Sequence, residues 1–395
     1  MIKSIKDVNV KNKTVLVRVD YNLPYDTRGN IADDRRIRAS LGTIAYLIEQ
    51  RAKVVLMTHS GRPGGKIIPA LSLEPAAARL SGLLKKEVVF VGECIGPKAE
   101  AAVTKANFGD VILLENLRFH AEETMNGMAF AKQLASLADL YVNESFATSH
   151  RAHASNTGIC AFLPGVAGLT LLNELRAVSR ALEDPAKPVV AVLGGAKVSD
   201  KIEIIQNLID KADSMILGGG IANTFIKAKG YNTGASLVDS GHILFAGEMI
   251  ELAGKKGKKL MLPVDFICGD AIENPTKVVL AADGSIPSDM AVYDVGPLSA
   301  ELFAAEILQA GTVIFNGPPG VFEHAPYESG TRTVANALAS SKAYTFAGGG
   351  DSAAAIEKFG CSSAISYIST GGGASLECLK GATLPGVEVL LRSDT

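Results

Sequence analysis

Residues 344–379 read YTFAGGGDSAAAIEKFGCSSAISYISTGGGASLECL, and the rest of the chain can be interpreted by starting from this stretch. It contains the same unit twice: a short apolar run, a glycine triplet and a helix-prone segment. Glycine at a strand-to-helix turn lets the backbone approach a ligand closely, and the start of a helix presents unpaired N–H groups that attract anions. One triplet alone is equally consistent with a flexible turn, whereas two in tandem predict a polyphosphate site.

Short apolar runs alternate with helical patterns on either side of this stretch. They lie at residues 15–19, 53–58, 88–91, 111–114 and 140–142, and then at 189–193, 215–217, 259–262, 278–281, 312–315, 344–346 and 364–368. This alternation is typical of α/β layers around a mostly parallel sheet. We therefore predict an α/β fold with two Rossmann-like domains, each a mostly parallel sheet flanked by helices. A connecting helix joins them, with a cleft between them.

The length of 395 residues also indicates two domains, because it is too great for one ordinary core. A helical period ends at Asp184-Pro185, and its apolar positions are Leu169, Leu172, Leu175, Val178 and Leu182. We predict a first domain at residues 1–167, a connecting helix at 168–184 and a second domain at 185–370. Residues 371–395 are expected to form a C-terminal segment that returns towards the first domain.

The composition favours a small-molecule partner. Lys and Arg number 39 and Asp and Glu 41, so the net charge of −2 offers no general attraction to nucleic acid or to an anionic membrane. The five cysteines contain no C-x-x-C pair, which favours free thiols in a reducing compartment. No run approaches the roughly 20 apolar residues of a membrane span. We predict a cytoplasmic protein.

Arginine and histidine follow the predicted strands of the first half. The basic residues are Arg36, Arg62, Arg118, Arg151, His59 and His153. Asp20 and Asn22 follow the first of these strands and add two polar side chains to the set. The carboxyl ends of parallel strands share one edge of a sheet, where doubly wound folds bind ligands. Each arginine alone is more simply explained as a surface ion pair. Because a guanidinium binds carboxylate or phosphate bidentately, several at one edge predict a small ligand with more than one negative group.

Glycine follows four predicted strands of the second half, at residues 194–195, 218–220, 348–350 and 371–373. None of these turns matches G-x-x-x-x-G-K-[ST] or G-x-G-x-x-G. Lys197 and Lys201 would share one face of a starting helix, where they can meet phosphate oxygens. Asp351 is either the N-cap of its helix or a ligand of Mg²⁺, and it could serve as both.

An anion site in one half and a polyphosphate site in the other predict phosphoryl transfer between them. Such transfer depends on positioning and on neutralisation of charge. A carboxylate acceptor, with a pKa of about 3.5, is ionised near neutral pH and needs no general base. The absence of an obvious base is consistent with this prediction.

The ordered motifs of the chain resemble those of the phosphoglycerate kinase family over essentially its whole length. They are RVDYNLP (18–24), DDRRI (33–37), HSGRP (59–63), ENLRF (115–119), HRAHAS (150–155), GGAKVSDK (194–201), LPVD (262–265), NGPPGVFE (316–323), GDS (350–352) and STGGGASLE (369–377). The resemblance implies transfer between ATP and the carboxylate of 3-phosphoglycerate, which gives ADP and 1,3-bisphosphoglycerate in glycolysis and gluconeogenesis. It implies a Mg²⁺-dependent enzyme and a monomer, with in-line transfer after hinge closure.

The resemblance also implies roles for particular residues. For 3-phosphoglycerate they are Asp20, Asn22, Arg36, His59, Arg62, Arg118 and Arg151. For the nucleotide they are Gly195, Ala196, Lys197, Lys201, Gly219, Gly220, Asn316, Pro318, Val321, Glu323, Gly350, Asp351 and Ser352, with Asp351 orienting the metal. The residues expected to act on the transferring group are Arg36, Lys197, Gly371 and Gly372.

Several positions depart from the family pattern without removing an expected ligand: Gly42, Ser60, Glu144, Ala147, Ser149 and Pro319. Two other functions compete with this assignment. A silent nucleotide-binding scaffold would be expected to lack Lys197, Arg36 or Asp351, and all three are present. A kinase for acetate or carbamate would not need three or four arginines at the acceptor site.

Overall fold

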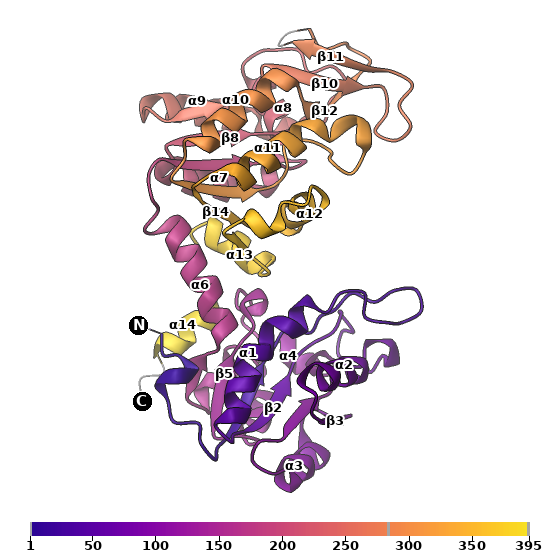
Figure 1. Ribbon diagram of the computed structural model, residues 1–395, viewed down its shortest axis with the longest axis vertical. Coiled ribbons are helices and arrows are strands. Elements are labelled where there is room, and N and C mark those ends of the chain that lie inside the picture. Colours follow the sequence, from indigo (N-terminus) through magenta and orange to yellow (C-terminus); the bar gives the residue numbers. More distant parts are fainter. Residues whose placement is uncertain (1, 283–284, 393–395) are drawn as a thin grey trace. The chain divides into compact units, whose positions relative to one another are not determined.

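The computed structural model describes residues 2–282 and 285–392, and the chain divides into two compact units (Figure 1). Unit 1 is built from the chain up to Arg176 and from Thr383 onward, and unit 2 from Ala177–Ala382. Unit 2 is therefore a continuous stretch of chain, whereas unit 1 is completed by a segment far along the sequence.

The core of unit 1 is a six-stranded parallel sheet with the strand order β3-β4-β2-β1-β5-β6. Its strands are β1 (Thr14–Arg18), β2 (Lys53–Met57), β3 (Val88–Val91), β4 (Val111–Leu114), β5 (Leu140–Asn143) and β6 (Gly165–Ala167). In the register of the central strands, Val15 of β1 lies opposite Val54 on one side and Leu140 on the other. The sequence predicted the first five strands and missed the short β6.

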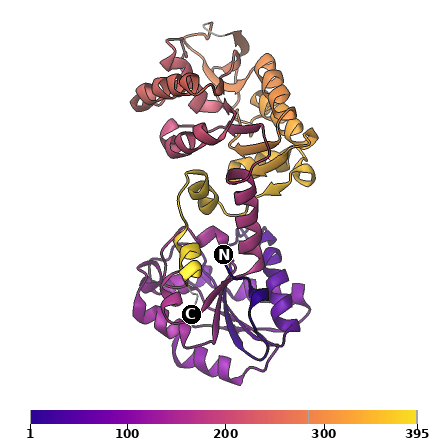
Figure 2. The ribbon, with the colours of Figure 1, turned by 90° about the vertical axis from the view of Figure 1, so that its left-hand side faces the viewer.

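Helices cover both faces of this sheet, as Figure 2 shows for unit 1. They are α1 (Arg35–Glu49), α2 (Glu74–Leu84), α3 (Gly96–Lys105), α4 (Ala121–Thr124), α5 (Met128–Ala135) and α14 (Pro385–Arg392). Every residue of β4 and β5 is buried, which is the expected result when apolar strands are covered on both sides. Helix α1 contributes Ile37, Ile44 and Leu47 to the core, one apolar stripe of an amphipathic helix.

The helix predicted after residue 167 is present as α6 (Leu169–Leu182), and the boundary between the units falls inside it. At its start, the buried Glu144 accepts hydrogen bonds from the backbone N–H of Thr170 at 3.2 Å. At its end, the Arg180 guanidinium lies 4.1 Å from the ring centroid of Tyr344, whose hydroxyl donates to the Ala177 carbonyl at 3.3 Å. These contacts join each end of the helix to the unit that contains it.

The main sheet of unit 2 also has six parallel strands, in the order β15-β14-β13-β7-β8-β9. Its strands are β7 (Val189–Leu193), β8 (Ser214–Leu217), β9 (Lys259–Met261), β13 (Thr312–Asn316), β14 (Tyr344–Ala347) and β15 (Tyr367–Ile368). The central strands β7 and β13 are buried throughout. The prediction of two mostly parallel sheets flanked by helices is confirmed.

The helices of unit 2 are α7 (Ile202–Lys211), α8 (Gly219–Ala228), α9 (Ile243–Lys255), α10 (Pro297–Leu308), α11 (Ser329–Ser340), α12 (Gly350–Lys358) and α13 (Gly373–Leu379). Helix α13 packs on α7, and Asn207 Nδ2 donates to the Leu379 carbonyl at 2.8 Å. Residues 371–382, which the sequence suggested as part of the returning segment, thus lie in unit 2. Among the described residues, no helix is both long and apolar enough to cross a bilayer.

Two predicted strands of the second half differ in the structure. The strand at residues 278–281 is present as β11 (Val278–Ala282), but it pairs antiparallel with β10 (Asp265–Gly269), which also pairs with β12 (Ala291–Val295). These three form a separate sheet, in which β11 is an edge strand. The residues of β11 are exposed at alternate positions, so one face of this strand is open to solvent. The strand predicted at 364–368 shrinks to Tyr367–Ile368, because a 3₁₀ turn occupies Ser362–Ala364.

Candidate active site

The basic residues of unit 1 gather at the carboxyl ends of four strands that are consecutive neighbours in the sheet: β4, β2, β1 and β5. Asp20 and Asn22 follow β1, His59 and Arg62 follow β2, Arg118 follows β4, and Arg151 follows β5. Arg36 reaches the same edge from the first turn of α1. The structure thus brings these residues to one place, as parallel strands require.

Hydrogen bonds between the loops fix the orientation of these side chains. Arg36 Nη1 donates to Asp20 Oδ2 at 2.5 Å, and Arg118 Nη1 donates to the Gly61 carbonyl at 2.7 Å. The Gly61 N–H in turn donates to Asn22 Oδ1 at 2.9 Å. The loop after β2 is therefore held by side chains that follow β1 and β4.

A cavity of about 370 Å³ opens among these residues. It is lined by Arg62, Gly64, Gly65, Arg118, Thr124, Arg151 and His153. Arg62 makes no hydrogen bond or ion pair with any described residue, and the buried Nε of Arg118 has no partner in the described structure. These guanidinium groups keep free donors for an anionic ligand.

The electrostatics of the cavity are those of a site built for negative charge. Burial and the nearby Arg18, Arg118 and Arg151 hold the pKa of His59 well below its usual value. Burial and the neighbouring Arg151 lower the pKa of Arg118 to about 10, and burial with Arg62 also lowers that of Arg151. Desolvation and mutual repulsion both disfavour the cations, so a bound anion would relieve the repulsion.

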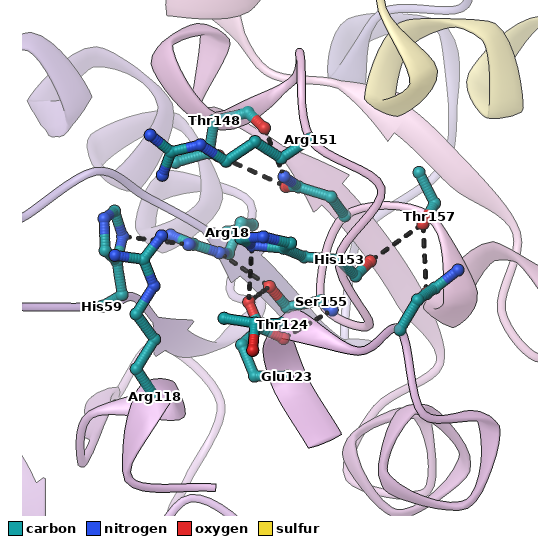
Figure 3. Close-up of polar contacts among 12 residues, drawn as sticks. Arg18, His59, Arg118, Glu123, Thr124, Thr148, Arg151, His153, Ser155 and Thr157 are labelled. Atoms are coloured by element: carbon teal, nitrogen blue, oxygen red, sulfur yellow. Dashed lines mark hydrogen bonds and ion pairs between the residues drawn. The ribbon is translucent and has the colours of Figure 1, made fainter. Parts of the chain in front are cut away.

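A buried network of polar side chains adjoins the cavity-lining His153, and Figure 3 shows its contacts. Arg18 is fully buried; its Nη2 lies 3.1 Å from His59 Nδ1, and its Nε donates to Ser155 Oγ at 2.9 Å. The Ser155 hydroxyl and N–H donate to the fully buried Glu123 at 2.6 and 3.0 Å. The sequence placed Arg18 in a motif but gave neither it nor Glu123 a role, because neither follows a strand in the way that marks the ligands.

His153 also lines the cavity, as expected from its place after β5. Its Nδ1 is buried without a hydrogen bond in the described structure and lies 3.8 Å from Glu123 Oε1. Burial and the surrounding arginines lower the pKa of His153 to about 4, so the ring is neutral near pH 7. It can therefore offer a neutral hydrogen-bonding group among cations.

Three turns of unit 2 interlock through their backbones. The Gly219 N–H donates to the Pro319 carbonyl at 2.8 Å, and the Ile221 N–H donates to the Gly195 carbonyl at 3.2 Å. A Cβ on Gly194 would collide with the backbone of Gly317 and Pro318, and one on Gly220 with that of Ala196. Close packing between turns thus explains several of these glycines without any ligand.

The two lysines of the first turn have different surroundings. Lys197 is exposed and makes no hydrogen bond or ion pair with any described residue. Lys201 is half-buried; its Nζ donates to Asn316 Oδ1, and burial lowers its pKa to about 8. Lys197 is thus available to an incoming anion, whereas Lys201 is already directed by Asn316.

Two residues expected to bind nucleotide have their polar atoms engaged within the protein. The buried Asn316 donates from Nδ2 to the Gly348 carbonyl at 2.6 Å and accepts from Lys201. Ser352 Oγ accepts from the Gly317 N–H at 2.8 Å and donates to Gly348 O at 2.9 Å. Both side chains tie the turn after β13 to the turn after β14.

Asp351 lies exposed in the first turn of α12, whose N-cap is Gly349, with φ of +97°. No side chain makes a capping hydrogen bond at this helix, so the N-cap reading of Asp351 is not supported. A Cβ on Gly350 would meet nothing within 4 Å. The start of α12 is therefore open to a ligand.

The other expected nucleotide positions surround these turns. Glu323 and Ala196 are exposed, and Pro318 and Val321 are half-buried; the Val321 N–H donates to the Tyr293 carbonyl at 2.8 Å. The Gly371 N–H donates to Ser369 Oγ at 3.1 Å, whereas Gly372, with φ of +49°, faces open space on its Cβ side.

A comparison with protein-family models matches residues 5–382 to "PGK: Phosphoglycerate kinase". The chain belongs to the phosphoglycerate kinase family. It is 48% identical over 387 residues to the phosphoglycerate kinase of Moorella thermoacetica, covering 98% of each chain. It is 47% identical over 389 residues to that of Pelotomaculum thermopropionicum, covering 98% of this chain and 99% of the relative.

Solved phosphoglycerate kinase structures share the fold. The Coxiella burnetii enzyme superimposes with a TM-score of 0.93 at 42% identity, covering 100% of both chains. The enzyme from Pyrococcus horikoshii OT3 gives a TM-score of 0.84 at 34% identity, covering 100% of this chain and 99% of that one. These comparisons confirm, over the whole chain, the resemblance to the phosphoglycerate kinase family that the motifs indicated.

Two residues that depart from the phosphoglycerate kinase pattern, Pro319 and Glu144, make specific contacts in the structure. Pro319 packs so closely on Gly218 that a Cβ on Gly218 would collide with it. Pro319 is therefore part of the interlocked turns. Glu144 lies at the start of α6, where its carboxylate receives the Thr170 N–H and hydroxyl. Neither residue lines the cavity of unit 1.

Proposed function

We propose that the basic cluster of unit 1 binds 3-phosphoglycerate and that the interlocked turns of unit 2 bind ATP or ADP. The reaction is the one that defines the phosphoglycerate kinase family: reversible phosphoryl transfer between ATP and 3-phosphoglycerate in glycolysis. The observation that supports the acceptor assignment best is the 370 Å³ cavity, in which Arg62, Arg118 and Arg151 keep donors for a ligand. The transfer from ATP to 3-phosphoglycerate is the direction that serves gluconeogenesis.

The charges of the acceptor match those of the cavity. 3-Phosphoglycerate carries a phosphate at one end and a carboxylate at the other, and arginine recognises both by paired hydrogen bonds. Arg62, Arg118 and Arg151 surround the cavity itself, and we assign them to the phosphate. Asp20, Asn22 and His59 are assigned to the hydroxyl and to the orientation of the substrate. Arg36, which Asp20 aims, is assigned to the carboxylate and to the transferring group.

The chemical step requires no general base. An oxygen of the ionised carboxylate attacks the γ-phosphorus of ATP, and the bond between that phosphorus and the bridging oxygen of ADP breaks. The developing charge needs donors already in place. Lys197 and Lys201 supply positive charge, and the backbone amides of Gly371 and Gly372 supply neutral donors. The Gly371 N–H must first exchange its hydrogen bond to Ser369 for one to the ligand.

The residues present also fit Mg²⁺ bound as a complex with the nucleotide. No group of three His, Cys, Asp or Glu side chains capable of holding a metal occurs in the described part of the chain. Mg²⁺ commonly uses one or two carboxylates with phosphate oxygens and water, so Asp351 at the open start of α12 is sufficient as the protein's contribution. When bound, the metal would neutralise phosphate charge.

Each ligand set lies within one unit, so neither requires a second copy of the chain, and this supports a monomer. The cysteines Cys94, Cys160, Cys268, Cys361 and Cys378 are all free. Free thiols are typical of a reducing compartment, which supports the cytoplasm as the place of action.

A coupled assay of the purified protein tests the proposed function. ATP-dependent turnover is expected with 3-phosphoglycerate and Mg²⁺, to be abolished by a chelator, and to be absent with acetate as acceptor. Turnover with acetate at a comparable kcat/KM would instead favour a kinase for simple carboxylates. No turnover in either direction would leave a nucleotide-binding scaffold as the better description.

A further inference from the structure

We infer that Asp239 is a positioning residue for nucleotide binding, which fixes the lysine-bearing segment 197–201 to helix α8. The inference rests on the proposed role of Lys197 and Lys201. Asp239 lies just before a 3₁₀ turn at Ser240–His242, well away in sequence from both lysines and from every motif that the proposed function uses. Its carboxylate bridges the segment and His242, the last residue of its own helical turn.

The contacts of the carboxylate leave both oxygens occupied. Oδ2 accepts the Ser199 N–H at 3.0 Å, and Oδ1 lies 2.8 Å from His242 Nδ1, which must donate because a carboxylate only accepts. The Asp239 side chain is 14% exposed, so these bonds are partly shielded from water. His242 and the Ser199 N–H hold the pKa of Asp239 below its usual value, and the group is therefore an anion at neutral pH.

The backbone of Asp239 links the same residue to a second turn. Its N–H donates to Thr224 Oγ1 at 3.0 Å, and that buried hydroxyl donates to the Gly220 carbonyl at 3.1 Å. Gly220 belongs to the turn that packs on Ala196. One residue thus connects the first turns of α8 with the segment that contains the lysines.

This connection affects Lys197 more than its neighbours, because the Lys197 side chain has no partner of its own in the described structure. Its position depends on the backbone of the 3₁₀ turn at Val198–Asp200, for which Lys197 is the N-cap. That turn is anchored on one side by the fully buried Val198 and on the other by the bond from Ser199 to Asp239. Removal of the carboxylate frees one of the two anchors.

The test compares Asp239→Ala with Asp239→Asn, and uses Asp210→Asn as a matched control. Asparagine keeps an oxygen that can accept the Ser199 N–H, whereas alanine does not. Asp210 is an exposed carboxylate of the same unit that pairs with Lys256. For Asp239→Ala we expect kcat/KM for ATP to fall about tenfold, as for loss of a hydrogen bond to a charged group, with KM for 3-phosphoglycerate unchanged. Asp239→Asn should lose less than about threefold, and the control should match wild type.

Hydrogen–deuterium exchange of the intact protein supplies a readout that general destabilisation would not reproduce. Amides of residues 195–201 should exchange faster in Asp239→Ala, while those of 58–63 in unit 1 keep the wild-type rate. Thr224→Val, which removes the second link and keeps the shape, should change the same amides to a smaller extent. Unchanged exchange and unchanged kcat/KM for ATP in both variants would overturn the inference, as would an equal rise of both KM values.

Lys197→Ala separates this inference from the proposed function. A wild-type kcat/KM for ATP in Lys197→Ala would refute the role of the lysine itself. A large loss in Lys197→Ala together with wild-type kinetics in Asp239→Ala would refute only the positioning role of Asp239.

Discussion

Arg36 Nη1 lies 2.5 Å from Asp20 Oδ2, and this ion pair joins the first turn of α1 to the loop after β1. It is the one hydrogen bond of the Arg36 side chain within the described structure, so the remaining guanidinium donors stay available. The Arg36 side chain is 37% exposed and that of Asp20 12%. The pair therefore orients the guanidinium and leaves its other N–H donors unused. This geometry is expected of a group that must also contact a ligand.

Arg36→Ala is expected to lower kcat by about 10² or more, because a donor aimed at charge in the transition state is worth about 3 kcal/mol. Steady-state kinetics with both substrates saturating measures this. Arg38→Ala is the matched control, since Arg38 lies on the same helix and pairs with Asp34 at the surface. An unchanged kcat with a raised KM would assign Arg36 to uniform substrate binding.

Arg118→Ala should raise KM for 3-phosphoglycerate at least about tenfold and leave KM for ATP unchanged, because it removes a charged hydrogen-bond donor from the cavity. Arg118→Lys keeps the charge but loses the planar fork, so it should recover only part of the affinity. Arg79→Ala, an exposed arginine that pairs with Asp34, serves as control. Equal effects on both KM values would contradict the assignment of Arg118 to the acceptor.

Asp351→Asn is expected to raise the Mg²⁺ concentration needed for half-maximal activity while leaving the melting temperature within about 1 °C of wild type. The side chain is exposed and makes no cap hydrogen bond, so its charge contributes little to folding. A magnesium titration and a thermal melt together decide the point. A drop of several degrees with an unchanged Mg²⁺ requirement would show that Asp351 stabilises α12 instead.

The buried Glu144 should make the stability of the protein fall as pH rises from about 4.5 to about 7. Burial raises its pKa from 4.5 to about 7, against the opposing hydrogen bonds of Thr170 and Thr43. The folded state therefore binds this proton more tightly than the unfolded state, and the stabilisation present below pH 4.5 is lost between about pH 4.5 and 7. The loss amounts to about 3 kcal/mol.

Urea denaturation of wild type and Glu144→Gln from pH 4.5 to 8 tests this contribution. The difference between the two proteins isolates Glu144, because slopes from His153 and other groups are common to both. Wild type should lose stability relative to Glu144→Gln as pH rises. A constant difference across this range would show that the carboxyl group of Glu144 has the same pKa in the folded and unfolded states.

Domain closure is expected when both ligands are present. The residues proposed to bind the acceptor belong to unit 1 and those proposed to bind the nucleotide belong to unit 2, whereas transfer needs the reacting atoms about 3 to 3.5 Å apart. Small-angle scattering should therefore show the radius of gyration falling most with 3-phosphoglycerate and a non-hydrolysable ATP analogue together, with flexing at the ends of α6 and near Ser369 and Thr370. An unchanged radius in the ternary mixture would refute hinge closure.

The strands and the gathering of the arginines were predicted correctly where the local sequence pattern and the parallel topology of the sheet lead to the same conclusion. Apolar runs such as residues 111–114 and 189–193 became buried central strands, because only a strand covered on both faces needs such composition. The gathering of Arg62, Arg118 and Arg151 was predictable because each follows a parallel strand. The strand order could not be read in this way, since it depends on which helices pack on which face.

The rest of the site depends on contacts between distant segments. The burial of Arg18 and Glu123 depends on Ser155, more than 130 residues from Arg18. Asn316 and Ser352 both donate hydrogen bonds to the Gly348 carbonyl, and the bond from Asn316 forms only because two turns pack together. A local sequence pattern cannot predict such packing. The β10 and β12 strands were missed for a different reason: their sequences, DFICG and AVYDV, contain Asp or Gly and are not continuous apolar runs.

The return of the chain into unit 1 has a consequence for its synthesis on the ribosome. The Asn143 side chain donates to the Gly386 carbonyl, the Gly386 N–H donates to Ser149, and Leu390 of α14 is buried. These partners of β5 emerge only after the whole of Ala177–Ala382 has been translated. Unit 2 can therefore complete its fold during elongation, whereas unit 1, although its first strands are made earlier, cannot pack α14 until Pro385–Arg392 has left the exit tunnel.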